Sequence, residues 1–269
     1  MTAYPRVWMI GETRLDHRAL FKFLEFNGTP KWHTDAPTDG ERLIEFAGRL
    51  CYQALDGNDT PQDDRKNPNI TRVREGNAVY IANLEAQLHG SVLEHVTVNF
   101  IISASRVVTH ELARHRVGVG ISQESGRFVR TQGPWDIYRP EAVEAVPEAV
   151  AIWDEALDYL SGVRDRLVKA LELDDTKLPF PAKKALTSAI RRLAPEGRQT
   201  ALVWSANLRA LRHIIAERTA PGAEIEIRHL FAAIAELVIA RYPNVFQQDL
   251  IREPQPDGPD WYRFEHRKV

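Results

Sequence analysis

The segment THELARHRVGVGISQESGRFVR, residues 109–130, places charged and hydroxyl side chains on both sides of a glycine-containing turn. Cations at the end of a helix complement its dipole by about 0.3–1 kcal/mol each, which accounts for one or two members of the triplet Arg114-His115-Arg116. It does not account for the run Ser-Gln-Glu-Ser-Gly-Arg that follows. A serine hydroxyl, backbone N–H groups beside glycine and an arginine fork can together bind phosphate oxygens. These residue types favour a pocket for a phosphorylated ligand over a solvated helix end.

A second polar group stands at the entrance of an alternating segment, in HGSVLEHVTVNF, residues 89–100. A lone histidine is more often a hydrogen-bonded structural residue than a ligand-binding one. Here His89 and His95 come with Glu94, which a purely structural interpretation explains less simply.

A third segment, SANLRALRHIIAERT, residues 205–219, carries a polar set on a predicted helix. The alternative is a solvated helix face. The spacings between these polar residues do not place them all on one stripe of a helix, so the pattern alone leaves both interpretations open. The set consists of Asn207, Arg209, His213 and Arg218.

The composition limits the class of protein. Lysine and arginine number 35 against 37 acidic residues, so the basic excess typical of non-specific nucleic-acid binding is missing. Cys51 is the single cysteine, which rules out an intrachain disulfide and favours a reducing compartment. One cysteine and scattered histidines predict no metal site. The first residues lack the pattern of a signal peptide, and no run approaches the ~20 apolar residues of a membrane span. We therefore expect a cytoplasmic protein without a membrane partner.

Hydrophobic periodicity predicts an α+β fold, with a small antiparallel or mixed sheet and a helical layer, in a single domain over residues 1–269. Strands are expected at 7–10 and at 91–102. In the second, Val96, Val98, Phe100 and Ile102 point one way and Thr97, Asn99 and Ile101 point the other. Ser103 or Ser105 is expected to cap the next helix, and Gly118 and Gly120 to end it. A polar loop is expected at 56–72. One further helix is predicted to end near Phe26. The remaining helices are predicted to span 41–54, 75–88, 150–173, 182–193, 201–217 and 223–241.

Taken together, the three polar segments resemble the flavin-dependent thymidylate synthases. That family has an Arg-His-Arg triplet, then seven residues, a serine, and an arginine two further on. It also has a histidine, a Ser or Thr two later and a Glu-His pair before the triplet, as in the run from His89 to His95. The late Asn-x-Arg with a distal arginine corresponds to Asn207, Arg209 and Arg218. The resemblance covers roughly residues 45–242, with the motifs in the family's order.

One departure concerns the spacing after the triplet. Eight residues, Val117 to Glu124, separate the triplet from Ser125 instead of seven, and two of them are glycines. The extra residue is expected to alter or loosen the loop beside the pyrimidine. It also leaves the register uncertain over 118–122.

The resemblance implies C5-methylation of dUMP, with methylenetetrahydrofolate as carbon donor, FAD as the hydride carrier and NADPH as reductant of the flavin. It also implies a homotetramer with its active sites between subunits. Arg218 would stabilise charge on the uracil ring, and Ser125 would bind substrate without acting as a nucleophile. The implied substrate-binding residues are Glu111, Arg114, Gln123, Glu124, Ser125, Gly126, Arg127, Arg191 and Arg218. The implied FAD-binding residues are Cys51, His89, Ser91, Glu94, Arg114, His115, Arg116, Val117, Asn207, Arg209 and His213.

Two alternatives stay open. A longer, glycine-bearing loop would admit a 2′-hydroxyl, so the substrate could be UMP, as in a nucleoside-antibiotic pathway. A non-catalytic flavin- or nucleotide-binding relative is the second. The intact set Ser125, Arg127, Arg191 and Arg218 speaks against it, since a mere binder of flavin could lose the substrate arginines.

Overall fold

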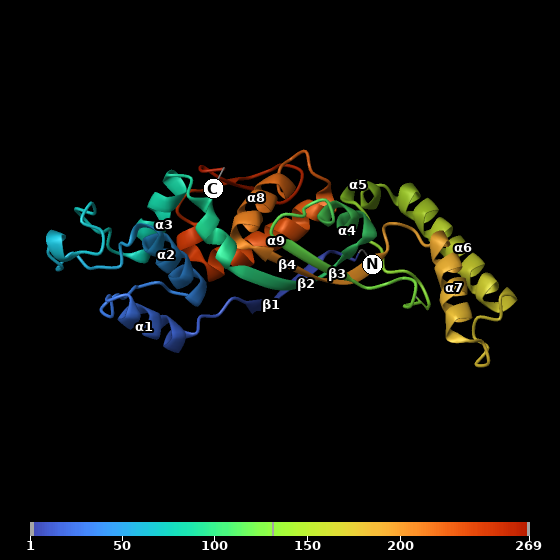
Figure 1. Ribbon diagram of the computed structural model, residues 1–269. Helices are drawn as coiled ribbons and strands as arrows, with labels where there is room; N and C mark the ends of the chain where they lie inside the picture. The colour runs from blue at the N-terminus through green and yellow to red at the C-terminus, as the bar shows by residue number, and fades with distance from the viewer. Residues whose placement is uncertain (1–2, 131, 268–269) are drawn as a thin grey trace.

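A four-stranded antiparallel sheet forms the centre of the protein (Figure 1). The computed structural model describes residues 3–130 and 132–267, so both ends of the predicted 1–269 domain, and the first two residues of the segment considered for a signal peptide, lie outside the described residues. The strand order is β1-β2-β4-β3, and every pairing is antiparallel. The bounds are Arg6–Glu12 for β1, Thr97–Ser105 for β2, Val119–Gln123 for β3 and Gln199–Asn207 for β4.

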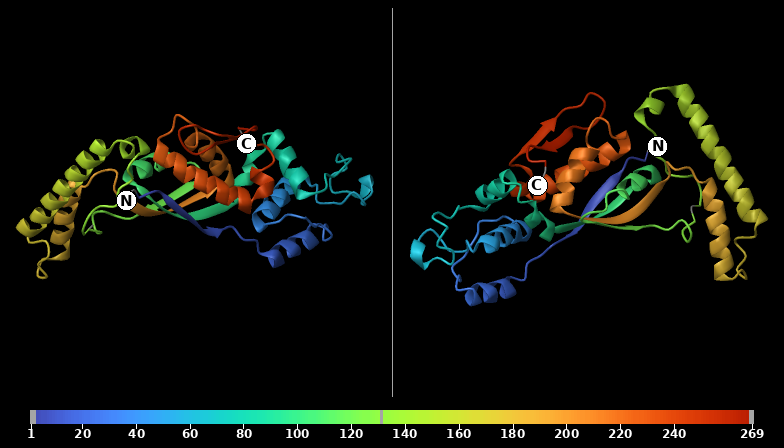
Figure 2. Two further views of the ribbon diagram at one scale, coloured as in Figure 1. Left: turned by 180° about the vertical axis from the view of Figure 1, so that it is seen from behind. Right: turned by 45° about the horizontal axis from the view of Figure 1, so that its top comes forward.

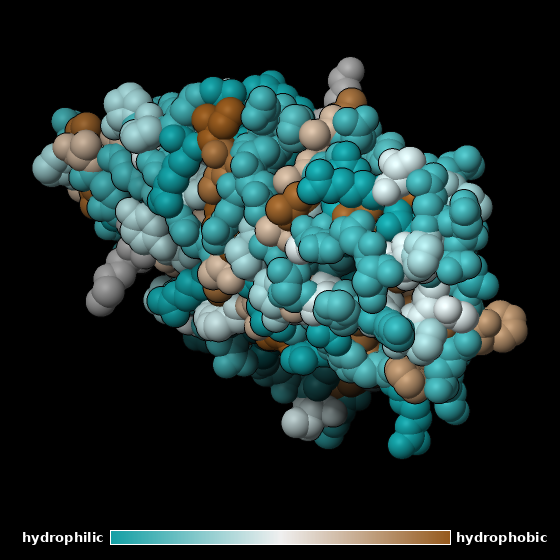
Figure 3. Space-filling view, turned by 90° about the vertical axis from the view of Figure 1, so that its left-hand side faces the viewer, coloured by the Kyte–Doolittle hydropathy of each residue, from teal (hydrophilic) through white to brown (hydrophobic). Residues whose placement is uncertain are grey.

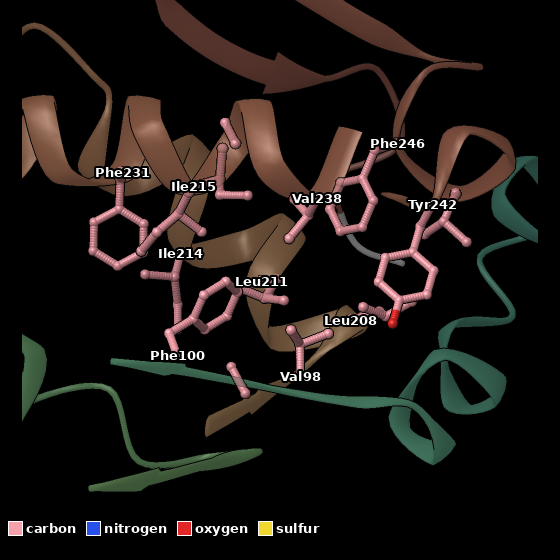
Figure 4. Packing of buried hydrophobic residues seen from close by; sticks show 14 of the residues in the cluster. Val98, Phe100, Leu208, Leu211, Ile214, Ile215, Phe231, Val238, Tyr242 and Phe246 are labelled. Atoms are coloured by element: carbon pink, nitrogen blue, oxygen red, sulfur yellow. The ribbon is translucent and has the colours of Figure 1, made fainter. Parts of the chain in front are cut away.

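One face of the sheet carries the hydrophobic core. Val98, Phe100 and Ile102 on β2 are fully buried, as the alternation predicted, and Trp204 on β4 lies beside Phe100. Figure 4 shows Val98 and Phe100 pointing toward apolar side chains of the two helices above the sheet. Burying such side chains contributes about 1.5–3 kcal/mol each. The covering elements are α8 (Leu208–Arg218), α9 (Ile225–Arg241) and the short α10 (Pro243–Phe246).

The N-terminal part of the chain builds one end of the molecule around the second predicted helix. Thr38 caps α2 by accepting a hydrogen bond from the Glu41 backbone N–H. A long loop then connects α2 to the next helix, as predicted for 56–72. Figure 3 views this end, and its surface is mainly hydrophilic. The elements are α1 (His17–Phe26), α2 (Asp39–Tyr52), α3 (Asn77–Ala86) and the 3₁₀ turns η1 (Gln62–Asp64) and η2 (Gly90–His95).

A helical hairpin projects from the opposite end of the sheet (Figures 1 and 2). The predicted apolar stripe of its long helix is only half-buried. In the described part of that helix, Arg164 is the one buried side chain. The hairpin therefore leaves apolar groups such as Ile152 and Tyr159 exposed, at 62% and 67%. Its elements are α5 (Glu141–Glu144), α6 (Pro147–Ala170), α7 (Phe180–Ile190) and the 3₁₀ turn η3 (Arg191–Leu193).

A C-terminal hairpin of β5 (Leu250–Glu253) and β6 (Trp261–Phe264) packs against α8. Thr219, just past the end of α8, accepts a hydrogen bond from the Tyr262 backbone N–H at 3.0 Å. Deeper inside, the buried Arg212 guanidinium lies 3.0 Å from Glu85 and 2.7 Å from Asp249. Burial raises the pKa of Glu85 to about 8, against the opposing effect of Arg212.

Among the residues that the structure describes, no helix lies over the centre of the sheet's second face (Figures 1 and 2). Trp8, Ile101 and Val203 stand in one row across three neighbouring strands. Their exposed fractions are 49%, 37% and 42%. An apolar row of this kind in the middle of a sheet is a common sign of an interaction surface.

The predicted helix over 201–217 is wrong in its first half. Residues 199–207 form strand β4, and α8 begins only at Leu208. The segment QTALVWSAN buries Thr200, Leu202, Trp204 and Ala206 in strict alternation, so pairing with β2 overrides its helix propensity.

Two further expectations are corrected around β2 and α4 (Arg106–Leu112). Residues 90–95 form η2, so the strand starts at Thr97 instead of Ser91. Ser105 caps α4, but this helix ends at Leu112, well before Gly118 and Gly120. Residues 119–123 are strand β3, so the segment with the extra residue is paired to β4 and is not a loosened loop.

Two helix glycines provide a test of the packing. A Cβ atom at Gly40 would lie 2.8 Å from the Tyr242 ring and 2.9 Å from Val96. We expect Gly40→Ala to lower the free energy of unfolding by about 1–3 kcal/mol, because the new methyl group overpacks the core. A Cβ atom at Gly162, on α6, would have no atom within 4 Å. Gly162→Ala should therefore raise the free energy of unfolding by about 0.5–1 kcal/mol. Urea denaturation followed by circular dichroism measures both. Equal midpoints for Gly40→Ala and wild type would contradict this description of the core.

Candidate active site

Arg218 lies at the end of α8 in a cluster with Glu111 and His115, which we call the Arg218 cluster. Its Nε donates to His115 Nε2 at 2.8 Å, and its Nη1 donates to Glu111 Oε2 at 2.7 Å. These bonds join residues more than a hundred positions apart in sequence. The guanidinium is therefore held by two partners, and its plane is fixed.

His115 is held in its neutral form. Burial lowers the pKa of His115 to about 4, and the nearby Arg218 and His213 act in the same direction. A neutral imidazole can accept the Arg218 N–H at Nε2 only if its proton is on Nδ1. The cluster thus combines one cation, one carboxylate and one neutral ring.

Asn207 joins the sheet to the helix that carries these residues. The Asn207 side chain caps α8 by accepting a hydrogen bond from the Ala210 N–H at 2.8 Å. The Asn207 backbone N–H donates to Gly118 O at 2.9 Å. Gly118 has φ +71°, and a Cβ there would lie 2.5 Å from Asn207 Nδ2. Only glycine fits this close approach, so the turn after the triplet is fixed against the start of α8.

The other residues implied for FAD gather on η2, the end of α2 and the exposed face of α8. Glu94 and Arg209 form an ion pair at 2.5 Å, and His89 stacks on Tyr52 with ring centroids 6.1 Å apart. The backbone packing of α2, η2 and α8 brings these elements together. All the side chains of this group are exposed or half-buried, namely Cys51, His89, Ser91, Glu94, Asn207, Arg209 and His213.

A second group of predicted residues surrounds the turn after β3. Ser125 O accepts from the N–H groups of Phe128 and Val129, which closes the turn. Gly126 is buried there, and a Cβ on it would lie 3.6 Å from Arg191 Cδ. We call Ser125, Gly126, Arg127 and Arg191 the phosphate-site candidates.

The structure does not place every predicted residue in one of these groups. Arg114, Arg116 and Val117 are exposed beside His115. Gln123 Nε2 donates to Thr109 on α4 at 3.2 Å, and the Glu124 backbone N–H donates to Ala201 O.

The two groups do not contact each other through polar side chains among the described residues of one chain. No hydrogen bond or ion pair within residues 3–130 and 132–267 links the Arg218 cluster to the phosphate-site candidates. The described part of the chain also contains no helix long and apolar enough to cross a membrane. Nor do its His, Cys, Asp and Glu side chains form a group of three that could hold a metal ion.

Sequence reasoning missed Arg198, which lies beside the phosphate-site candidates. Its Nη2 would be 3.0 Å from a Cβ on Gly126. Arg198 stands just before β4, in a segment without a helical or strand periodicity of its own. Once β4 is recognised as a strand, its antiparallel pairing with β3 brings Arg198 to the turn at Gly126.

Comparison with known proteins identifies the family of the chain. The family model described as "Thymidylate synthase complementing protein" matches residues 34–244, which is most of the chain. The chain belongs to the flavin-dependent thymidylate synthase family and is an enzyme of that kind.

Relatives and a solved structure extend the match. A flavin-dependent thymidylate synthase of Mycolicibacterium gilvum is 35% identical over 227 residues, covering 82% of this chain and 85% of its own. The flavin-dependent thymidylate synthase of Mycobacterium marinum is 36% identical over 248 residues, covering 91% of this chain and 90% of its own. The crystal structure of the UMP/dUMP methylase PolB from Streptomyces cacaoi, bound with 5-Br dUMP, superposes with a TM-score of 0.63. It is 15% identical and covers 91% of this chain and 94% of that chain, so it supports the α+β fold alone.

The neutral state of His115 predicts a pH dependence of stability. The unfolded chain binds a proton at His115 near pH 6.5, whereas the folded chain binds it only near pH 4. Stability is therefore lost as the pH falls through this window, because the unfolded state takes up the proton first. We expect His115→Gln to lose less unfolding free energy than wild type between pH 7 and pH 4.5. Denaturant titrations at the two pH values measure this.

The same cluster allows a direct check by NMR titration of the His115 ring. Arg218→Gln should raise the pKa of His115 only in part, because burial is the larger cause. A His115 midpoint near 6.5 in the wild-type protein would contradict the described cluster.

Proposed function

We propose that the protein methylates C5 of a uridine nucleotide, most directly dUMP, in a flavin-dependent reaction. Methylenetetrahydrofolate supplies the carbon and NADPH the reducing equivalents. The observation that carries the proposal is the Arg218 cluster, in a chain of this family. A guanidinium held by a carboxylate and a neutral imidazole is a preorganised partner for charge that develops on a substrate ring.

Arg218 has donor capacity left for a ligand. Its Nε and Nη1 are bound to His115 and Glu111, while the described residues supply no hydrogen-bond partner to Nη2. Addition of hydride at C6 of uracil places negative charge on the ring and its carbonyl oxygens. A fixed N–H donor at the ring edge stabilises that charge without reorganisation. Glu111 and His115 serve to hold the donor in position.

The exposed group on η2, α2 and α8 fits FAD. When bound, the flavin supplies the hydride chemistry. Its pyrophosphate calls for cations and its adenine for hydrogen-bond donors, and Arg209 with the neighbouring His213 on α8 offers both. The exposed Cys51 is a small polar neighbour there and no nucleophile is needed from it.

The nucleotide phosphate belongs at the turn after β3. The buried Gly126 lets the backbone approach a ligand closely, and Arg191 supplies a guanidinium there. Ser125 contributes a hydroxyl and Arg127 a second cation. In this proposal these residues bind the phosphate, while the Arg218 cluster acts on the uracil ring.

A homotetramer explains how two separate groups act on one nucleotide. We propose that the Arg218 cluster of one subunit faces the phosphate-site candidates of another. The apolar row Trp8, Ile101 and Val203 on the open face of the sheet supports such association. So do the exposed apolar side chains of α6.

UMP is the second candidate substrate. The extra residue after the triplet lies in the segment that contains β3, directly before Ser125. A shift of this strand changes the space beside the ribose, where a 2′-hydroxyl is accepted or refused. Parallel turnover with dUMP and UMP, with mass detection of the methylated product, decides between them.

The proposed role of Arg218 predicts a rate effect. We expect the purified protein to carry FAD. We expect Arg218→Ala to lower the single-turnover rate at which dUMP and methylenetetrahydrofolate oxidise the reduced flavin, on the order of a hundred-fold or more. Arg218→Lys should not restore the rate fully, because an ammonium lacks the planar fork. FAD binding, followed by absorbance, should persist in both variants.

Arg252→Lys is the matched control, since Arg252 lies on β5 and pairs with Asp260 at 2.5 Å. Its flavin oxidation rate should equal that of wild type. An unchanged rate in Arg218→Ala would remove Arg218 from the chemistry.

The shared site predicts complementation between two inactive variants. We expect Arg218→Ala and Arg191→Ala each to be nearly inactive alone. If subunits exchange after mild dissociation and mixing, about a quarter of the composite sites should regain both wild-type groups. Activity of the mixture, compared with each variant treated in the same way, measures this. A mixture as inactive as its components, with subunit exchange verified by mass spectrometry, would place both groups in one chain.

A further inference from the structure

Two guanidinium groups converge on Gly126. A Cβ at Gly126 would lie 3.0 Å from Arg198 Nη2 and 3.9 Å from Arg191 Nη1. Both arginines line the same cavity at the C-terminal end of α7, and Gly126 forms part of its wall. Arg191 begins η3 and Arg198 precedes β4, so two elements deliver cations to one backbone position.

These two cations differ from the other arginines in the wall of that cavity. Arg164 donates to Asp165 and to Gly133 O and lies over the Trp135 ring, and Arg130 pairs with Asp174 at 2.5 Å. Among the described residues, the side chains of Arg198 and Arg191 have no hydrogen-bond or ion-pair partner within bonding distance. Arg164 and Arg130 therefore have partners within the protein, whereas the guanidinium groups of Arg198 and Arg191 are available to bind a ligand.

The surroundings of Arg198 disfavour a charge there in the absence of an anion. Burial lowers the pKa of Arg198, and the nearby Arg106 and Arg191 lower it further, against the opposing Glu124. Arg106 is the first residue of α4, where the helix dipole also disfavours a cation. Arg198 is thus repelled by two further like charges, Arg106 and Arg191, unless an anion comes between them.

We propose that Arg198 is a further substrate-binding residue, which together with Arg191 holds the phosphate of the nucleotide at the Ser125–Gly126 turn. The inference rests on the proposed function and adds to it. A phosphate monoester carries close to two negative charges at neutral pH and three acceptor oxygens. Two guanidiniums from different elements can each bind separate oxygens, and the turn at Ser125 offers its hydroxyl to the remaining one.

The competing explanation makes Arg198 a structural partner of Glu124. Glu124 is exposed, and its carboxylate lies beyond ion-pair distance from Arg198, while Oε2 receives the Ala201 N–H at 3.5 Å. Exposed pairs of this kind contribute little to stability. This explanation predicts that replacing Arg198 has the same effect on ligands with and without a phosphate.

The test compares dUMP with deoxyuridine, which is the same ligand without its phosphate. Dissociation constants are measured by isothermal titration calorimetry on the FAD-loaded protein for wild type, Arg198→Gln and Arg198→Lys. We expect Arg198→Gln to weaken dUMP binding roughly ten- to a hundred-fold, the range of a charge-assisted hydrogen bond. Deoxyuridine binding should not change, and Arg198→Lys should recover part of the dUMP affinity. Inorganic phosphate should compete with dUMP less well in the Gln variant.

Arg18→Gln is the control, because it removes the same charge from the exposed face of α1, at the opposite end of the sheet. It should keep the wild-type ratio of the deoxyuridine to dUMP dissociation constants. An unchanged ratio in Arg198→Gln, or equal weakening of both ligands, would overturn the proposal. So would a wild-type protein that prefers dUMP to deoxyuridine by less than about ten-fold. If methylation fails while the ratio falls as expected, the proposed reaction is wrong and the phosphate site stands.

Discussion

The central part of the site depends on one junction, where β4 ends and α8 begins at Asn207. The Asn207 backbone belongs to the sheet, its side chain caps the helix, and its N–H is tied to Gly118 in the turn after the triplet. Arg198 precedes the strand, Arg209 and His213 follow on the helix, and Arg218 ends it. The positions of the site residues on β4 and α8 therefore depend on how this strand leads into this helix.

The core explains why the junction is rigid. Trp204 and Ala206 on β4 and Leu208 and Leu211 on α8 belong to one buried cluster. A change in the angle between strand and helix would have to repack all of these side chains, and protein interiors are close-packed. On the opposite side, the C-terminal hairpin holds the end of α8 through Thr219 and Tyr262. The guanidinium of Arg218 thus stands on an element fixed at both ends, as a preorganised donor requires.

Local patterns were sufficient for the elements with long amphipathic periods and for the buried alternation of β2. They failed where a segment obtains its structure from a distant partner. The run from Thr200 to Ala206 suits a helix by composition, and only its pairing with β2 makes it a strand. β3 was missed because it is short and has glycines around it, and its register depends on β4.

The site shows the same limit. The motifs carried by contiguous residues, such as the triplet at 114–116, are visible in the sequence. The bonds from Arg218 to Glu111 and His115 cross more than a hundred residues, and no spacing rule predicts them. Arg198 became recognisable only when the fold brought it to Gly126.

The buried trio of Glu85, Arg212 and Asp249 has a consequence for the heat of unfolding. Two carboxylates face one guanidinium, and the pKa of Glu85 stands near 8, so the folded protein retains a proton there at neutral pH. The unfolded chain releases it, since an exposed glutamate titrates near 4.5. The contribution of Glu85 to the free energy of unfolding is complete below pH 4.5 and declines as the pH rises toward 8. The enthalpy of unfolding at neutral pH must therefore include the protonation heat of the buffer that receives this proton. A calorimetric scan in phosphate and one in Tris would then differ in enthalpy for the same protein.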